Sequence, residues 1–220
     1  MKRLRSALLV VAAVCGVFAA TATSAFAHEW EIKGMSLKSL GLGSQGFASS
    51  GGKVDFDWLL GSEHQKWSCL TQSGSGQLLP EGKLESTIKY SGCGFTAGAF
   101  AAEHCVISTP IESVVTGELA QLGEKAYVRY SGKAQGKTLI VKLTGCMSAG
   151  TWAFSGTFSA LAEPFGVQFV EQPRTFSQAI DEANGTKIIP AGSPSNPVWI
   201  SGSAKEKLTG GFAGAMWGAT

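Results

Sequence analysis

The side chains that could carry out chemistry in this chain are few and scattered. Its histidines are His28, His64 and His104, and two of its aspartates, Asp55 and Asp57, are two residues apart. Histidine is the most frequent general base of enzymes, and two carboxylates on one strand face could form a hydrolytic pair or bind calcium. The chain has no Gly-x-Ser-x-Gly and no His-Glu-x-x-His motif, which excludes the α/β-hydrolase elbow and the common zinc proteases.

A structural or solubilising role is favoured for each of these groups. Asp55 and Asp57 stand beside Lys53 on the wet side of a predicted strand, where charges discourage pairing with other chains. A calcium site also needs more oxygen ligands than two carboxylates supply. His64 and His104 lie in polar sequence near predicted loops. We therefore expect no catalytic residue, no metal site and no cofactor.

Trp199 is the best candidate for a binding residue. The chain has six tryptophans, and most fall on the apolar face of a predicted strand. Trp199 instead alternates with Val198 and Ile200, so it shares a face with Ser201. A tryptophan beside small hydroxyl side chains resembles the sugar-stacking platform of many carbohydrate-binding modules. Trp199 and Ser201 are therefore the candidate ligand-binding residues. The alternative is that the Pro-rich loop at 194–197 covers Trp199.

The first 27 residues have the features of a secretory signal peptide. Lys2, Arg3 and Arg5 form a positive start, the apolar stretch 7–20 is short for a membrane span, and Ala25-Phe26-Ala27 offers a cleavage site. We predict residues 1–27 as signal peptide and 28–220 as one β-rich domain that is secreted or associated with the cell envelope. Retention of the N-terminal segment as an anchor is the alternative.

The composition excludes several classes of protein. Hydrophobic residues make up 44% and charged residues only 15%, which is unlike a disordered tail. After cleavage the chain carries fifteen basic and sixteen acidic residues, so a binding site for nucleic acid built on positive charge has no support. We expect no nucleic-acid partner and no transmembrane segment in the exported part.

His28 would be the first residue of the exported chain, and could bind copper through its α-amino group and ring. In this it resembles the lytic polysaccharide monooxygenases, whose mature chains begin with such a histidine on a β-sandwich. The resemblance stops there, because the second copper-binding histidine would have to be His64 or His104, and neither has a supporting motif.

Four cysteines remain after the signal peptide: Cys69, Cys93, Cys105 and Cys146. An even number in an exported chain predicts two disulfides, and the absence of Cys-x-x-Cys makes zinc or redox chemistry a poor interpretation. Four cysteines allow three connectivities. We predict Cys93–Cys105, across a Gly- and Ala-rich connection, and Cys69–Cys146, between strand ends that are far apart in sequence.

Alternation of apolar and polar residues dominates the exported part. For example, Trp30 and Ile32 alternate with charged neighbours, which indicates a strand with one buried and one wet face. No shift in composition marks a domain boundary. The pattern predicts one all-β domain, an antiparallel β-sandwich or flattened barrel of about ten strands. The predicted strands are 28–33, 53–58, 84–90, 111–119, 125–131, 138–144, 151–161, 165–172, 198–203 and 213–217.

Helix signals are weak in comparison. Residues 97–105 could form one or two turns. Residues 175–183 are a better candidate, because Asn184-Gly185 can end a helix through a left-handed residue. The Pro-rich segment 190–197 is predicted to be a loop.

Short motifs give one further indication. They are a Gly-Cys pair at two strand ends (Gly92-Cys93 and Gly145-Cys146), Thr109-Pro110-Ile111 before a strand, and a terminal Trp217-Gly218-Ala219. With the signal peptide, they make the chain similar to a set of uncharacterised secreted proteins of Gram-positive soil bacteria. The resemblance implies export and an all-β fold. Because that set has no assigned activity, it implies no functional residue.

These observations favour a secreted, non-catalytic β-domain with a binding or structural role, whose expected ligand is a polysaccharide or another component of the cell envelope. One alternative is a secreted polysaccharide-active enzyme, acting through Asp55 and Asp57 or through a copper site at His28. The other is a small outer-membrane-type β-barrel, because alternating strands with aromatic residues are typical of that class too.

Overall fold

The computed structural model describes residues 28–162, 166–190 and 196–220, and strands dominate them. The predicted signal peptide and residues 191–195 of the predicted loop lie outside these ranges. The strands are β1 (Trp30–Ile32), β2 (Met35–Ser36), β3 (Gln45–Leu60), β4 (Glu63–Leu79), β5 (Lys83–Ala97), β6 (Val106–Ile107), β7 (Ile111–Leu122), β8 (Lys125–Gly132), β9 (Lys137–Thr144), β10 (Gly150–Leu161), β11 (Glu171–Phe176), β12 (Ile188–Pro190), β13 (Val198–Leu208) and β14 (Trp217–Ala219). The helices are α2 (Ala99–Ala102), α3 (Gln178–Asn184) and the 3-10 turn η1 (Gly210–Phe212).

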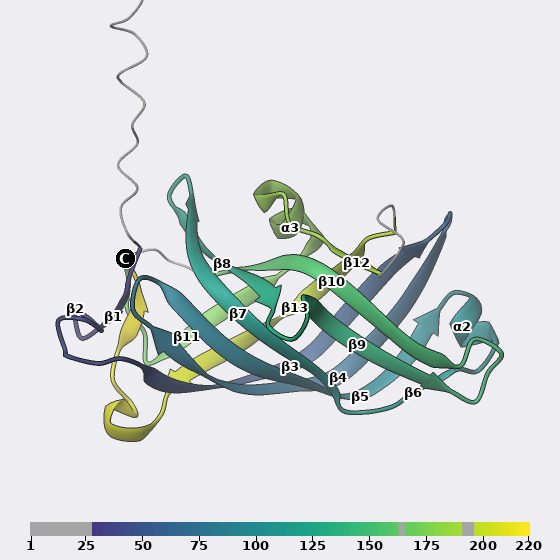
Figure 1. Cartoon of the computed structure of the whole chain (residues 1–220), viewed down its shortest axis with the longest axis horizontal. Coiled ribbons are helices and arrows are strands. Elements are labelled where there is room, and N and C mark those ends of the chain that lie inside the picture. The colour runs from purple at the N-terminus through teal and green to yellow at the C-terminus, as the bar shows by residue number, and fades with distance from the viewer. Residues whose placement is uncertain (1–27, 163–165, 191–195) are drawn as a thin grey trace, which may run out of the picture.

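The main sheet closes on itself, as Figure 1 shows. Its strands follow the order β11-β13-β3-β4-β5-β7-β8-β10, and β10 pairs back onto β11 through Leu161 and Thr175. Strands β9 and β6 continue from β10, and β12 bridges β10 and β13. The all-β prediction is confirmed, and the closed ring corresponds to its flattened-barrel form. Eight strands in a ring enclose a space just wide enough for side chains or one small ligand.

Two long hairpins build the wall formed by β3, β4 and β5. A tight turn at Gly61 joins β3 to β4, and a second turn ending at Gly82 joins β4 to β5. Gly82 has a φ of 67°, and a Cβ added there would lie 2.4 Å from the carbonyl oxygen of His28. Both the backbone conformation and the close approach therefore require glycine at this position.

Aromatic side chains fill the interior. Phe56 and Trp67 stack with ring centroids 4.8 Å apart, and Tyr130 stacks on Phe158 at the same distance. The inward residues are those that the alternating pattern predicts: in β9, for example, Leu139, Val141 and Leu143 are buried while their neighbours are exposed or less deeply buried, apart from the buried Thr138.

Each end of the barrel has its own cover (Figure 1). A three-stranded sheet, β14-β1-β2, lies at one end and brings Trp30 and Trp217 into the core. The indole N–H of Trp30 donates to the carbonyl of Lys83 at 2.7 Å. At the other end the short helix α2 carries Phe100, which is 4% exposed. None of the helices in the described residues is long and apolar enough to cross a membrane.

The predicted disulfide connectivity is wrong, although the prediction of two disulfides agrees with the structure. The bonds are Cys69–Cys93 and Cys105–Cys146. Cys69 and Cys93 lie directly opposite each other on β4 and β5. Cys105 immediately precedes β6 and Cys146 follows β9, and these two strands pair with each other. Strand pairing, rather than the composition of the connecting segments, therefore decides which cysteines meet.

Several element boundaries also differ from the prediction. The strand expected at 165–172 is β11 instead, and it begins at Glu171; 163–165 lie outside the described residues. The strand expected at 213–217 begins only at Trp217, after η1. Ile188–Pro190, partly inside the predicted loop, pairs with β10 as β12. The helix α3 is confirmed, but its first predicted residues belong to β11 and Ser177 caps it, accepting from the N–H of Ile180.

Peptide mapping of the unreduced chain 28–220 should therefore recover Cys69 linked to Cys93 and Cys105 linked to Cys146. Trypsin alone leaves Cys93 and Cys105 on one peptide, 90–125, so a second cleavage after Glu103 is needed to separate them. Mass spectrometry of the double digest distinguishes the connectivities. A linked pair that contains Cys93 and Cys105 would contradict the structure.

Candidate functional site

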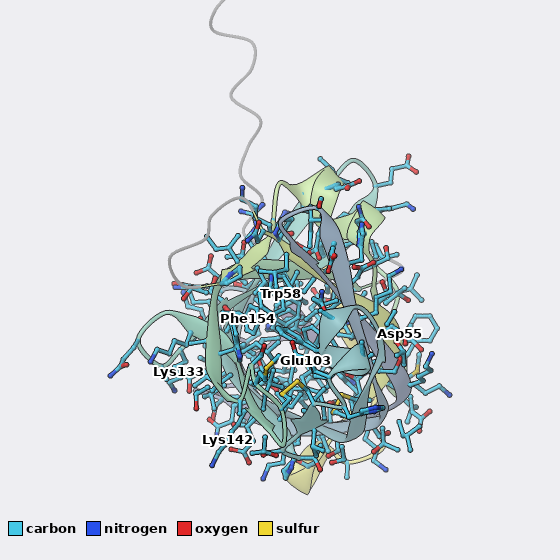
Figure 2. The ribbon with its side chains drawn as sticks, turned by 90° about the vertical axis from the view of Figure 1, so that its right-hand side faces the viewer. Asp55, Trp58, Glu103, Lys133, Lys142 and Phe154 are labelled. Carbon is cyan, nitrogen blue, oxygen red and sulfur yellow. A yellow bond between two sulfur atoms is a disulfide. The ribbon has the colours of Figure 1, made fainter. Side chains whose placement is uncertain are left out.

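Strands β13, β3 and β4 bring the predicted binding residues together on one outer face. Trp199 lies opposite Asp57, and Ser201 lies opposite Asp55. Directly opposed residues of antiparallel strands project from the same face of the sheet. Figure 2 shows Asp55 on the outside of the barrel wall and Trp58 in its interior. We call this surface the β13–β3–β4 face; it comprises Trp199, Ser201, Lys53, Asp55, Asp57, His64, Lys66 and Ser68.

Trp199 differs from the other five tryptophans. Four of them are at most 2% exposed, and Trp152 packs against the core from a partly buried position. Trp199 is partly exposed and does not belong to the core cluster. It also makes no ring contact with another aromatic side chain of the described residues. Part of its side chain therefore lies at the surface, and residues 194 and 195 of the loop named above as its alternative cover lie outside the described residues.

Charged partners surround both aspartates of the face. Oδ1 of Asp57 lies 2.6 Å from Nδ1 of His64, and its Oδ2 lies 3.3 Å from Nζ of Lys66. Asp55 lies 2.8 Å from Nζ of Lys53 and accepts a hydrogen bond from Ser68. Such exposed pairs contribute at most about 1 kcal/mol each to stability. These ion pairs therefore add little to the stability of the fold. Their effect is to gather charged groups and hydrogen-bond acceptors on one face.

The electrostatics of Asp55 do not suit acid catalysis. Hydrogen bonds from Lys53 and Ser68 hold the pKa of Asp55 below its usual value. A carboxyl group that donates a proton at neutral pH needs a raised pKa instead. Asp55 thus stays ionised and accepts hydrogen bonds.

His64 has an orienting carboxylate but no nucleophile. Its Nδ1 contacts Asp57, which is the arrangement of a catalytic histidine and its carboxylate. No hydroxyl group of the described residues forms a hydrogen bond with the other ring nitrogen, and Ser68 donates to Asp55 instead. A Ser-His-Asp triad is therefore not assembled on this face.

The β13–β3–β4 face contains a hollow. Lys53, Asp55, Asp57, Lys66, Ser68 and Ser201 line a hollow of about 350 Å³. Two lysines and two aspartates give this lining no net charge, and every one of these six side chains can donate or accept a hydrogen bond. The hollow can therefore hold an uncharged, hydroxyl-rich molecule.

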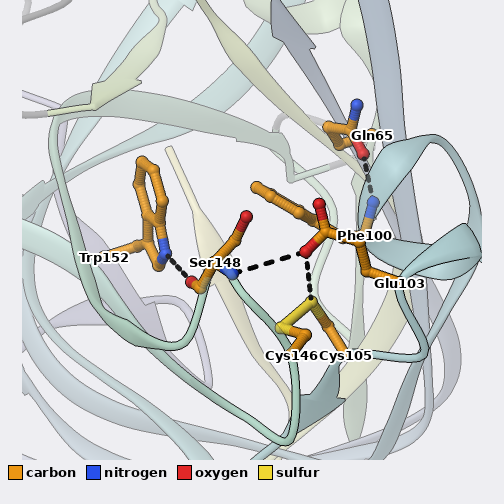
Figure 3. The surroundings of a disulfide bond; sticks show 7 residues. All are labelled: Gln65, Phe100, Glu103, Cys105, Cys146, Ser148 and Trp152. Carbon is orange, nitrogen blue, oxygen red and sulfur yellow. Dashed lines mark hydrogen bonds between the residues drawn. A yellow bond between two sulfur atoms is a disulfide. The ribbon is translucent and has the colours of Figure 1, made fainter.

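Within the described residues, one group of three potential metal ligands occurs, and it does not suit a metal. It consists of Glu103, Cys105 and Cys146. The two cysteines form a disulfide and provide no thiolate, and a carboxylate oxygen of Glu103 accepts from the N–H of Ser148 at 3.3 Å (Figure 3). His28 precedes β1 at one end of the barrel, whereas His104 follows α2 and His64 lies beside Gly98 at the other end (Figure 1), so His28 is not brought together with either of the histidines that a copper site would need.

Comparisons with known proteins add no further assignment. No family model, no curated protein and no solved structure matches the chain.

The sequence prediction missed three partners of the face, namely His64, Lys66 and Ser68. The signal for them is the turn at Gly61, which places Leu60 opposite Glu63. Counting back from this turn puts Asp57 opposite Lys66 and Asp55 opposite Ser68. The hairpin register, read together with the alternation, is sufficient to find them.

Proposed function

We propose that the exported chain is a non-catalytic binding domain that holds a polysaccharide on the β13–β3–β4 face. The observation that carries this proposal is the position of Trp199. It is the one tryptophan of six that lies outside the core and is not packed against it, and it stands beside Asp57 on a polar, hollowed surface. A large apolar ring left at the surface among hydrogen-bonding groups favours a ligand with an apolar face and a polar edge.

A sugar ring meets both requirements of this surface. Its C–H face can stack on the indole of Trp199, while its hydroxyl groups donate to Asp55 and Asp57 and accept from Lys53 and Lys66. Each carboxylate already pairs with a lysine, Asp55 with Lys53 and Asp57 with Lys66, so these groups are gathered on the face before a ligand binds. The balanced charge of the lining favours an uncharged polysaccharide over an anionic one.

Export supports a ligand outside the cell. The signal peptide predicted at 1–27 directs secretion, and two disulfides are typical of proteins that fold in an oxidising compartment. The proposed location is therefore the cell envelope or the medium, where polysaccharides are abundant.

The proposal predicts that Trp199→Ala lowers retention of the protein on its polysaccharide by at least about tenfold, because central tryptophans contribute about 2 kcal/mol or more to binding. The exported chain is incubated with insoluble cellulose, chitin, xylan and bacterial cell wall, and protein in the pellet and sugar in the supernatant are measured in the same tube. Retention on at least one polysaccharide without release of sugar is expected.

Ile140→Ala provides the matched control, because Ile140 is 42% exposed on β9, away from the β13–β3–β4 face. This variant should be retained like the wild type. Equal retention of Trp199→Ala and wild type would refute the proposed face. Release of soluble sugar that disappears in Asp57→Asn would instead identify an enzyme.

A further inference from the structure

We propose that the barrel interior beneath α2 is a second binding site, which takes one small, uncharged aromatic molecule with a carbonyl oxygen. The site is independent of the β13–β3–β4 face, since its residues point inward from the strands whose other side forms that face. Figure 2 looks into this end of the barrel and shows Trp58 and Phe154 inside the wall that carries Asp55 outside.

The barrel interior beneath α2 is packed with aromatic side chains. The ring of Trp58 lies 5.1 Å from Trp152 and 5.3 Å from Phe154, measured between centroids. The ring centroids of Trp67 and Phe95 lie 6.1 Å apart in the same cluster. Edge-to-face arrangements of this kind are favourable for a further aromatic ring.

Three buried N–H groups in these walls have no acceptor among the described residues. They are the indole N–H of Trp58 and Trp67 and the side-chain amide N–H of Gln65, and each of these residues is at most 2% exposed. Trp58 lies directly opposite Gln65, and Trp67 follows Gln65 by two positions on the same inner face. Because buried donors of folded proteins are nearly always paired, three adjacent donors without an acceptor favour a ligand that brings oxygen atoms.

Phe100 of α2 occupies the place that the ring of such a ligand would take. Its ring centroid lies 5.3 Å from Phe95, 5.7 Å from Trp58 and 5.9 Å from Trp152. Its backbone N–H donates to the side-chain oxygen of Gln65 at 3.1 Å, as Figure 3 shows. Withdrawal of Phe100 would therefore leave room for a ring among these aromatic side chains and would free the side chain of Gln65 from its hydrogen bond to Phe100.

The segment around α2 is suited to such a movement. The helix has only four residues, and the disulfide Cys105–Cys146 tethers the chain directly after it. Gly98, with a φ of 94°, precedes it, and a Cβ there would lie 2.3 Å from Oε1 of Gln65, so only glycine allows the chain to enter α2 this close to β4. The proposal requires this short segment to swing out while its two ends, at Gly98 and at the disulfide, stay attached to the barrel.

The charge at this end indicates a neutral ligand. Glu103, which follows α2, places a carboxylate at this end of the barrel. The buried Arg174 lies at the other end, beside Trp30 and Trp217. An anionic ligand would meet repulsion without a compensating cation. A ketone, ester or amide oxygen on an aromatic ring can accept from up to two of these donors without a charge.

Acetophenone and ethylbenzene provide the test, because they share the ring and nearly the size but only acetophenone has an oxygen. Calorimetric titration of the exported chain should show acetophenone binding at least tenfold more tightly than ethylbenzene. Phe100→Ala should bind acetophenone at least tenfold more tightly than the wild type, since the competing ring is removed. Trp58→Phe and Trp67→Phe keep a ring but lose an N–H, and each should lower the preference for acetophenone several-fold.

Trp199→Ala should leave acetophenone binding unchanged, which separates this site from the polysaccharide face. The proposal is overturned if the wild type binds neither compound, or binds both with equal affinity because water already satisfies the donors. The wild-type preference decides even if Phe100→Ala fails to fold.

Discussion

Replacing Arg174 with methionine is expected to destabilise the folded chain by about 3–5 kcal/mol, the cost of leaving one member of a buried ion pair alone. Nη2 of Arg174, on β11, lies 2.9 Å from a carboxylate oxygen of Glu206, on β13, and the two side chains are 0% and 6% exposed. Burial already raises the pKa of Glu206, and Arg174 opposes that effect. Urea unfolding at neutral pH measures the loss.

The double variant Arg174→Met and Glu206→Leu should recover most of this stability, because apolar side chains of similar volume replace a buried ion pair at little cost. Recovery is expected to be incomplete. The guanidinium also lies 5.6 Å from the ring centroids of both Trp30 and Trp217, and cation–π contacts of this kind contribute up to about 2 kcal/mol.

An exposed ion pair between the same two strands is the control. Lys205 on β13 lies 3.3 Å from Glu171 on β11, and both side chains are at least half exposed. Lys205→Met should therefore cost less than about 1 kcal/mol. In Arg174→Met, lowering the pH should reduce the deficit, because Glu206 then folds in its neutral form. A double variant as unstable as Arg174→Met would contradict the argument.

Arg174 also shows where inference from sequence reaches its limit. Gln172, Arg174 and Phe176 alternate as inward residues of β11, but an arginine on an inner face is improbable from sequence alone. Pro173, between two of them, argues further against a strand, since it lacks an N–H. The predicted strand therefore ended before Arg174. Only the closure of the barrel, which brings Glu206 and two tryptophans to this point, explains its burial.

The disulfides, in contrast, could have been predicted correctly. Leu79 pairs with Lys83 around the turn, so residues equidistant from Glu81 face each other. Cys69 and Cys93 each lie twelve residues from Glu81. Alternation predicts the strand 84–90 on one side of this turn but no strand on the other side, where β4 lies, so the prediction lacks the register that pairs the two cysteines. The composition of the 93–105 connection then determines the predicted pairing.

The candidate face was partly predictable for the same reason. Alternation alone placed Trp199 with Ser201 and Asp55 with Asp57, each pair on one strand face. Alternation does not say that β13 pairs with β3, because 146 residues separate Ser201 from its β3 partner Asp55 and the barrel must close before these strands become neighbours. Non-local pairing of this kind depends on the whole sheet rather than on any local pattern.

Asp181→Asn is expected to stabilise the protein at pH 7.5 by about 2–3 kcal/mol, and to leave its stability at pH 4 almost unchanged. Asp181 is 2% exposed, and its Oδ1 accepts from the N–H of Ser159 at 2.7 Å and from the hydroxyl of Thr186 at 2.8 Å. Burial, only partly offset by these hydrogen bonds, raises the pKa of Asp181 from 3.8 to about 6. Asparagine keeps the accepting oxygen and carries no charge.

The sign of the pH dependence follows from this raised pKa. In the unfolded chain the carboxyl of Asp181 loses its proton near pH 4, whereas in the folded chain it keeps the proton up to about pH 6. The folded state thus binds more protons between these values, and stability falls as the pH rises through them. A shift of about two pKa units corresponds to about 3 kcal/mol. Urea unfolding of both proteins from pH 4 to 8 gives the difference, which should grow up to about pH 6 and then stay constant.

Glu182→Gln is the control for this prediction, because Glu182 is the exposed neighbour of Asp181 on α3 and its side chain accepts from Gln178 at 2.8 Å. The control should keep most of the wild-type pH dependence, because the charge of Glu182 is the smallest of the contributions to the raised pKa of Asp181. Glu206, whose pKa burial also raises, contributes a slope of the same sign to every variant and cancels in the difference. If Asp181→Asn kept the full wild-type slope between pH 4 and 6, the buried carboxyl would not be its source. Asparagine can still accept from the N–H of Ser159 and the hydroxyl of Thr186, so the pH-dependent difference reports the charge of Asp181 rather than lost hydrogen bonds.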